Sequence, residues 1–169
     1  KCVMVFQHST LFESMSCAEN VALPLRKHRG MKPAVALSEA QRLLEQVHMA
    51  EFGDRFPSEL GDGMRKRVAI ARALTLQPRY VLFDEPTTSL DPVSARRVDK
   101  LIRELSDSLG VTSIVVSHDL ASIFTIADRI VMLYGGSVRM LGTPAEFRGS
   151  DDAIIDQFIN GRAEGPMEA

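Results

Sequence analysis

Short apolar runs of the kind that form buried strands recur along this chain. They occupy residues 3–6, 80–83, 112–116 and 130–134. Patterns of helical period separate the later runs. One of them extends from Pro92 to Leu109 and is followed by Gly110, a residue type that often terminates helices. Strands that alternate with helices are typical of a parallel sheet joined by helical crossovers. The sequence therefore predicts an α/β fold built on a parallel sheet.

The segment between the first two runs is helical in pattern. Ser16 can cap a short helix that Pro24 interrupts, and an amphipathic stripe follows. The stripe consists of Val35, Ala36, Ala40, Leu43, Leu44 and Val47. We therefore expect a helical part at about residues 14–77, placed between core segments at residues 1–13 and 78–149.

The C-terminal region carries weaker signals. Gly135-Gly136 predicts a turn into residues 137–141, and Thr143-Pro144 predicts the start of a short helix. Residues 150–169 would form a tail, and its end from Gly161 onward is rich in Gly, Pro and Glu, which favours a loose terminus.

Composition and charge exclude several classes of protein. With 20 basic and 22 acidic residues the net charge is −2, so no overall positive field favours nucleic acid as a partner. The two cysteines, Cys2 and Cys17, argue against a disulfide framework and favour a reducing compartment, with the cytosol as the default. Every apolar stretch is far shorter than a membrane-spanning helix, so we expect no direct membrane insertion. The chain also opens inside a strand-like run without an initiator Met, and we expect it to start within a fold.

The most informative segment is Tyr80-Val81-Leu82-Phe83-Asp84-Glu85-Pro86, in which four strand-type residues deliver two carboxylates to a strand end. Ligands of open α/β sheets bind at that edge. Asp84 is suited to hold a Mg²⁺ ion, and Glu85 is suited to orient and polarise an attacking water. A strand that ends in an acidic turn explains Asp-Glu-Pro equally well, so the neighbouring motifs have to decide.

Two further polar groups are expected at the same edge of the sheet. Ser89-Leu90-Asp91 comes shortly after Glu85, and Ser117-His118-Asp119 follows the next strand. A single histidine is more often structural than catalytic. Because His118 stands directly after a strand, one strand beyond the two carboxylates, its imidazole could reach a phosphate and the water that attacks it.

A glycine-containing loop lies upstream of these motifs. The sequence Leu60-Gly61-Asp62-Gly63-Met64 precedes a basic helix that we expect to run from Arg65 to about Leu76. Glycines before a helix let backbone N–H groups and the positive end of the helix dipole approach an anion. Such a loop is usually only a turn, and Gln7 at the end of the first strand is an equally common strand terminus. Each signal is weak by itself.

Taken in order, these motifs closely resemble the ABC ATPase family over nearly the whole chain. The resemblance implies a P-loop NTPase-type parallel core with an inserted α-helical subdomain, and ATP and Mg²⁺ as cofactors. In the family's terms Gln7 is similar to the Q-loop residue that senses Mg²⁺, and residues 60–64 look like the signature motif that caps ATP on the opposite subunit. The remaining motifs match as follows: Asp84 and Glu85 resemble Walker B, Asp91 the D-loop and His118 the switch histidine. The resemblance also implies a head-to-tail homodimer in which one chain supplies half of each ATP site.

The departures from the family pattern are equally informative. The family's signature usually reads Leu-Ser-Gly-Gly-Gln, whereas Gly61, Asp62 and Met64 replace Ser, Gly and Gln here. No Gly-x-x-x-x-Gly-Lys-Ser/Thr occurs in the sequence, although that P-loop cradles the phosphates. We expect a truncated ATPase rather than a degenerate one, because Asp84, Glu85 and His118 are all retained.

The partners follow from the resemblance. The interval between Gln7 and Leu60 suits a transporter's helical subdomain and leaves no room for the long coiled coil of DNA-repair ATPases. Leu11, Phe12 and residues 18–25 resemble the segment that receives a membrane permease, although ordinary helix packing would also explain them. The subunit would then lie in the cytoplasm, peripherally on the inner face of the plasma membrane.

The cargo is suggested by two details. Met64 and the ending Gln157-Phe158-Ile159-Asn160-Gly161 up to Pro166 look most like Mla-type phospholipid-trafficking ATPases of Gram-negative envelopes. The alternatives are the ATPase subunit of another transporter, for amino acids or other solutes, a non-transport ABC ATPase, and a purely structural binding module. The direction of transport is left open.

Overall fold

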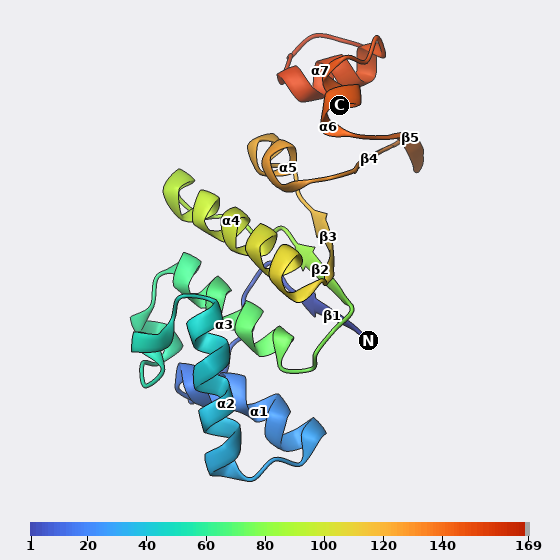
Figure 1. Cartoon of the computed structure of the whole chain (residues 1–169). Coiled ribbons are helices and arrows are strands. Elements are labelled where there is room, and N and C mark those ends of the chain that lie inside the picture. Colours follow the sequence, from blue (N-terminus) through green and yellow to red (C-terminus); the bar gives the residue numbers. More distant parts are fainter. Residues whose placement is uncertain (168–169) are drawn as a thin grey trace. The chain divides into compact units, whose positions relative to one another are not determined.

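The computed structural model describes residues 1–167 and separates the chain into two compact units, Lys1–Asp119 and Leu120–Ala169. Figure 1 shows the order of the elements along the chain. Each unit has its own core, and each is described by itself below. The predicted division into core, helical part and tail stays a prediction.

A parallel sheet with the strand order β1-β2-β3 forms the centre of the first unit. The strands are β1 (Cys2–Val5), β2 (Tyr80–Asp84) and β3 (Thr112–Val116), which confirms the parallel arrangement predicted for these three runs. Side chains alternate along a strand, so Val5, Val81 and Phe83 share one buried face. Helix α3 (Asp62–Leu74) contacts β1, and helix α4 (Pro92–Leu109) contacts both α3 and β3. Phe6, Ile114 and Val116 are exposed.

Helix α4 begins and ends where its caps predict. Asp91 accepts hydrogen bonds from the Val93 and Ser94 amides, and Pro92 fills the first helical position. Gly110 ends the helix at φ +63°, a left-handed conformation that costs glycine nothing. Because both caps are strong, the helix that follows Asp91 starts at a fixed point.

The insert between β1 and β2 is entirely helical, as the sequence predicts. It contains α1 (Cys17–Arg29), α2 (Pro33–Gln46), two 3-10 turns, η1 (Ala50–Phe52) and η2 (Pro57–Glu59), and α3. Figure 1 shows α1 and α2 running beside each other, and both contact α3. Ser16 caps α1 in a reciprocal capping box with Glu19.

Three expectations about this insert are wrong. Helix α3 begins at Asp62, so residues 62–64, which were expected to form a loop before a helix starting at Arg65, form its first turn. Pro24 does not interrupt α1, which continues past it to Arg29. Proline removes one backbone hydrogen bond, but the buried side chains of Val21 and Leu25 hold the turns on either side in the core. Val35 does not belong to the buried stripe of α2, because it is 55% exposed, whereas Ala36, Ala40, Leu43, Leu44 and Val47 are buried.

The second unit is built on a hairpin. It contains α5 (Leu120–Ile126), β4 (Ile130–Tyr134), β5 (Ser137–Gly142), α6 (Pro144–Arg148) and α7 (Ala153–Asn160). The fourth apolar run thus pairs antiparallel with β5, because Gly135 and Gly136 both take positive φ and turn the chain back. Thr143 caps α6 as predicted. Met132, Phe147 and Ile155 form the core of this unit.

The part of the tail that the structure describes is not loose. The buried Gln157 side chain donates to the Arg162 carbonyl at 3.3 Å and accepts from the Met167 amide at 2.7 Å. A Cβ at position 165 would lie 2.3 Å from Gln157 Oε1, which explains why glycine occupies Gly165. The tail to residue 167 is therefore held against α7, and the expectation for residues 168–169 lies outside the described residues.

Candidate active site

The two acidic residues of the strand motif stand where the sequence places them. Asp84 is the last residue of β2, and Glu85 follows it with φ +46°, an uncommon conformation for a residue with a Cβ. The Glu85 amide donates to the Val116 carbonyl at 2.9 Å, which ties this residue to the end of β3. The carboxylate is thereby fixed at the carboxyl edge of the sheet.

The structure brings Glu85 and His118 into direct contact. His118 Nδ1 lies 2.9 Å from Glu85 Oε1, and the Thr88 hydroxyl donates to Glu85 Oε2 at 2.8 Å. Partial burial raises the pKa of Glu85, but the hydrogen bonds from His118 and Thr88 outweigh burial and lower it below its ordinary value. The same bond to Glu85 raises the pKa of His118 above its ordinary value. The pair therefore consists of an ionised carboxylate and an imidazole that protonates more readily than usual.

A network on α4 supports the loop that carries His118. Arg96 contacts Asp119 Oδ2 at 2.6 Å and Asp99 Oδ2 at 3.1 Å, and Asp99 is 1% exposed. Ser117 Oγ accepts from the Asp119 amide at 3.0 Å. The residue next to His118 is therefore held by a helix that starts at Asp91.

The signature-like residues 61–64 line a hollow of about 320 Å³ together with residues 89–91. Leu60 is buried, Gly61 is the N-cap of α3, and Asp62 pairs with Arg65. Gly63 lies so close to α4 that a Cβ there would be 3.2 Å from Ser94 Cβ. Residues 61–64 and 89–91 line this hollow together with Arg67, Ser94 and Arg97. The amides of the first turn of α3, and the positive end of its dipole, suit an anion here.

Asp91 stands at the same hollow, but its carboxylate already has partners. It caps α4, and the side-chain and backbone hydrogen bonds from Ser94, with a further one from Val93, lower the pKa of Asp91. This side chain therefore stays ionised, and any contact with nucleotide would add to its capping role.

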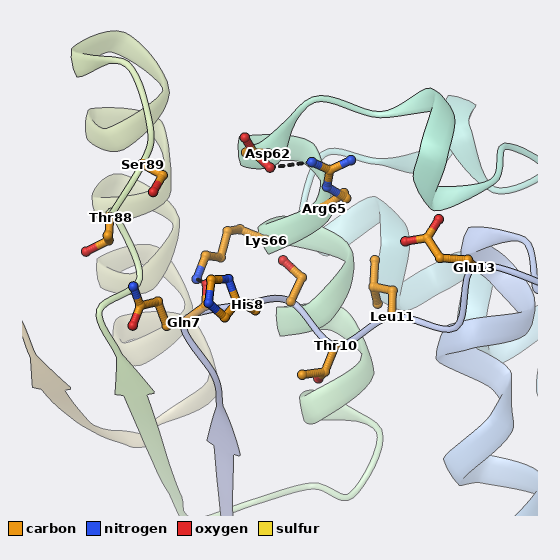
Figure 2. A pocket seen from close by; sticks show the side chains of 11 residues that line it. Gln7, His8, Thr10, Leu11, Glu13, Asp62, Arg65, Lys66, Thr88 and Ser89 are labelled. Atoms are coloured by element: carbon orange, nitrogen blue, oxygen red, sulfur yellow. Dashed lines mark hydrogen bonds and ion pairs between the residues drawn. The ribbon is translucent and has the colours of Figure 1, made fainter.

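Gln7 lies at a second hollow, of about 290 Å³. Figure 2 shows Gln7 beside His8 and Lys66, with Thr88 and Ser89 above Gln7. Gln7 is exposed and follows β1, while its backbone carbonyl accepts a close hydrogen bond from Lys66 Nζ. Asp62 and Arg65 line the same hollow, so one wall is shared with the signature-like residues.

The side chains of Asp84 and Gln7 could bind Mg²⁺ only when phosphate oxygens complete its coordination. Among residues 1–167, no group of three or more His, Cys, Asp and Glu side chains could hold a metal ion by itself. Asp84 and Gln7 offer one carboxylate and one amide oxygen, and Mg²⁺ is commonly held by one or two such groups plus substrate phosphates and water. The residues present therefore fit a nucleotide-bound Mg²⁺ ion.

Part of the segment expected to contact a permease is buried in the helical insert. Val21, Ala22 and Leu25 are buried, so ordinary helix packing explains these three residues. Phe12 is 50% exposed. In the part of the chain that the structure describes, no helix is long and apolar enough to cross a membrane.

Sequence reasoning missed three residues of this region. Lys66 is buried, Thr88 holds the Glu85 carboxylate, and Arg96 holds the loop of His118. Only Lys66 left a signal, because it lies one helical turn before the buried Ile70 and so faces the core. Thr88 and Arg96 occupy positions where polar residues are common on loops and helix surfaces.

A protein-family model matches the N-terminal half of the chain. The model of the family described as ABC transporter matches residues 1–88, which includes Gln7, residues 60–64, Asp84 and Glu85. Asp91 and His118 lie beyond the matched residues.

Two curated relatives and one solved structure show the extent of the likeness. The intermembrane phospholipid transport system ATP-binding protein MlaF of Escherichia coli K12 is 38% identical over 164 residues, 97% of this chain. The sulfate/thiosulfate import ATP-binding protein CysA 2 of Agrobacterium fabrum is 40% identical over 157 residues, 92% of this chain. The chain spans 61% of the length of the former and 46% of the latter.

The solved structure is a dimeric post-hydrolysis state of the ATP-binding cassette MJ0796 bound to ADP and Pi. It has a TM-score of 0.73 and 33% sequence identity, and the match covers 85% of this chain and 63% of that one.

Proposed function

This chain belongs to the ABC transporter family, within its ATP-binding domain, and from this premise we propose that it forms part of an ATP-hydrolysing transport subunit. The observation that carries the proposal is the 2.9 Å contact between Glu85 and His118 at the carboxyl edge of the sheet. The complete activity belongs to a full-length subunit, since the relatives are longer than this chain.

The residues divide the chemistry between them. Glu85 stays ionised, so one carboxylate oxygen can accept a hydrogen bond from the attacking water while Thr88 fixes the other oxygen. His118 carries a proton more readily than usual, and a protonated imidazole stabilises negative charge that develops on a phosphate. Asp84 and Gln7 would hold Mg²⁺, which neutralises phosphate charge when it is bound. Residues 60–64 would cap the ATP of a second subunit.

Lipid transport is the cargo we propose, in a phospholipid-trafficking system of a Gram-negative envelope. MlaF matches nearly the whole chain, and Met64 and the tail anchored by Gln157 are the features that suggested this cargo. Import of another solute is the second candidate, because CysA 2 has a comparable identity. Isolation of the subunit with its permease, followed by analysis of co-purified lipid, separates the two.

The partners we propose are a second copy of the subunit and a membrane permease. The exposed Phe12 ring supports a permease contact at this loop. The subunit would then lie on the cytoplasmic face of the inner membrane.

The test of catalysis is Glu85→Gln in the full-length subunit. The amide keeps the shape but cannot act as the base, so kcat should fall by about 10²-fold or more while ATP still binds. Glu51→Gln is the matched control, because Glu51 is exposed on η1 and lines neither hollow. Near-normal turnover in Glu85→Gln would exclude Glu85 as the base. The 169-residue chain alone, which has no P-loop sequence, should not hydrolyse ATP above background.

A further inference from the structure

A buried cation stands at the candidate active site without an assigned role. Lys66 lies in the first half of α3, and only 3% of its surface is exposed. Lysine is almost never buried this completely unless its ammonium group has partners. Burial lowers the pKa of Lys66, and the charges of Asp84, Asp62 and Glu85 oppose that effect. Packing alone therefore does not explain why a lysine is buried at position 66.

The partners of the ammonium group are backbone carbonyls of the Q-loop. Lys66 Nζ donates to the Phe6 carbonyl at 3.2 Å and makes a closer bond to the Gln7 carbonyl. A hydrogen bond from a charged donor is roughly twice as strong as a neutral one. Two such bonds hold the chain at the point where β1 ends and the Gln7 side chain leaves the backbone.

A second cation on the same helix holds the next part of the loop. Arg72 donates to the Thr10 carbonyl at 2.8 Å and to the Ser9 carbonyl at 3.1 Å. Thr10 has φ +49°, so this part of the loop takes a path that the backbone does not favour by itself. The contacts of Lys66 and Arg72 fall on different residues, which allows their effects to be separated.

We propose that Lys66 is a positioning residue that fixes the Gln7 peptide to the helix whose first turn carries the signature-like residues. The proposal rests on the proposed function, because Gln7 matters through its place beside Mg²⁺ and phosphate. Displacement of Gln7 in one ATP site would then move α3, and with it residues 61–64, which serve the other site.

The first experiment measures the mobility of the Gln7–His8 peptide group in the full-length protein without nucleotide. Lys66→Met keeps an unbranched side chain as far as Cε and removes the ammonium donors, and Lys66→Arg restores donors. We expect the ¹⁵N order parameter of the His8 amide to fall from about 0.85 to below about 0.6 in Lys66→Met and to recover in Lys66→Arg. Arg72→Met is the matched control, which should loosen Thr10 and leave His8 ordered.

The second experiment measures the Mg²⁺ concentration that gives half-maximal ATP hydrolysis. Lys66→Met should raise this concentration several-fold, and Arg72→Met should raise it less. If Lys66→Met does not fold, as judged by circular dichroism, Lys66→Gln takes its place.

Failure of the inference differs from failure of the proposed function. An ordered His8 amide in folded Lys66→Met overturns the inference whatever the ATPase activity. Equal changes in the Mg²⁺ requirement of Lys66→Met and Arg72→Met also overturn it, because they would show general loosening of the loop. Absence of hydrolysis in the unmutated protein would count against the proposed function, while the order parameter would still decide the role of Lys66.

Discussion

Gly61→Ser restores the hydroxyl that the family's usual signature carries at this position. The backbone at Gly61 has φ −69° and ψ 160°, which any residue adopts, and a Cβ there would meet nothing within 4 Å. Gly61 is the N-cap of α3 and makes no side-chain capping bond. A serine therefore fits without strain and can accept a hydrogen bond from the Gly63 or Met64 amide while its own proton remains free to donate.

The capping bond and the bond to phosphate differ in strength. Serine improves on glycine at an N-cap by only a few tenths of a kcal/mol, so the melting temperature should rise by about 1 °C. A bond from the hydroxyl to a phosphate oxygen of the opposite site is worth roughly 1.5–3 kcal/mol, or about ten- to a hundredfold in affinity at most. Pairing with Arg65 offsets the charge of Asp62, which would otherwise repel the phosphate. We therefore expect ATP-dependent dimerisation to strengthen, or KM for ATP to fall, by several-fold.

Gly61→Ala separates the hydroxyl from the added Cβ. Both variants and the unmutated full-length subunit are compared for ATP-dependent dimerisation by analytical ultracentrifugation and for KM by steady-state kinetics. A serine variant that binds ATP no better than the alanine variant would show that the hydroxyl contact does not limit this site, and the reasoning above would then be wrong.

Two other predictions concern stability and pH. Asn20 is fully buried and bonds both the amide and the carbonyl of Phe12, so Asn20→Ala should lower the free energy of unfolding by roughly 2–4 kcal/mol in urea titrations. Asn160→Ala, at an exposed site on α7, is the control, and equal losses would contradict this estimate. The Glu85 bond raises the pKa of His118, so its stabilising effect is fully present below the unfolded-state pKa and is lost as pH rises through the folded-state pKa. NMR titration of the imidazole should show this pKa falling in Glu85→Gln, and an unchanged value would refute the assignment.

The parts of the fold that could be predicted are those specified by local signals. Asp91, Pro92 and Gly110 set the bounds of α4 because caps and a left-handed glycine act over a few residues. Pro24 misled the prediction, because packing of Val21 on the core overrides a local break. Such tertiary compensation leaves no trace in the neighbouring sequence.

The fourth apolar run shows a second limit. The sequence predicted a strand at residues 130–134 and a turn at Gly135-Gly136. It did not predict that this strand pairs antiparallel with β5. A short apolar run specifies a strand, whereas the choice between parallel and antiparallel neighbours depends on contacts made after the turn.

The contact between Glu85 and His118 was predictable because both residues follow strands that are neighbours in a parallel sheet. The contacts of Lys66 and Thr88 were not, since one depends on a carbonyl far away in sequence and the other on a positive φ at Glu85. Every residue has a backbone carbonyl, so no sequence motif identifies the carbonyl that Lys66 binds.

The loop after β1 is held through its backbone groups. This bears on how such a protein can change during evolution. Lys66, Arg72 and Asn20 bind mostly carbonyl and amide groups of residues 6–16, which every amino acid supplies apart from proline's missing N–H. Exposed side chains of this segment that lie outside the candidate active site, such as Phe12, can therefore be exchanged without altering the path of the chain. If a permease contacts this loop, as proposed above, a lineage could acquire a new membrane partner by substituting these side chains alone, and the candidate active site would keep its geometry.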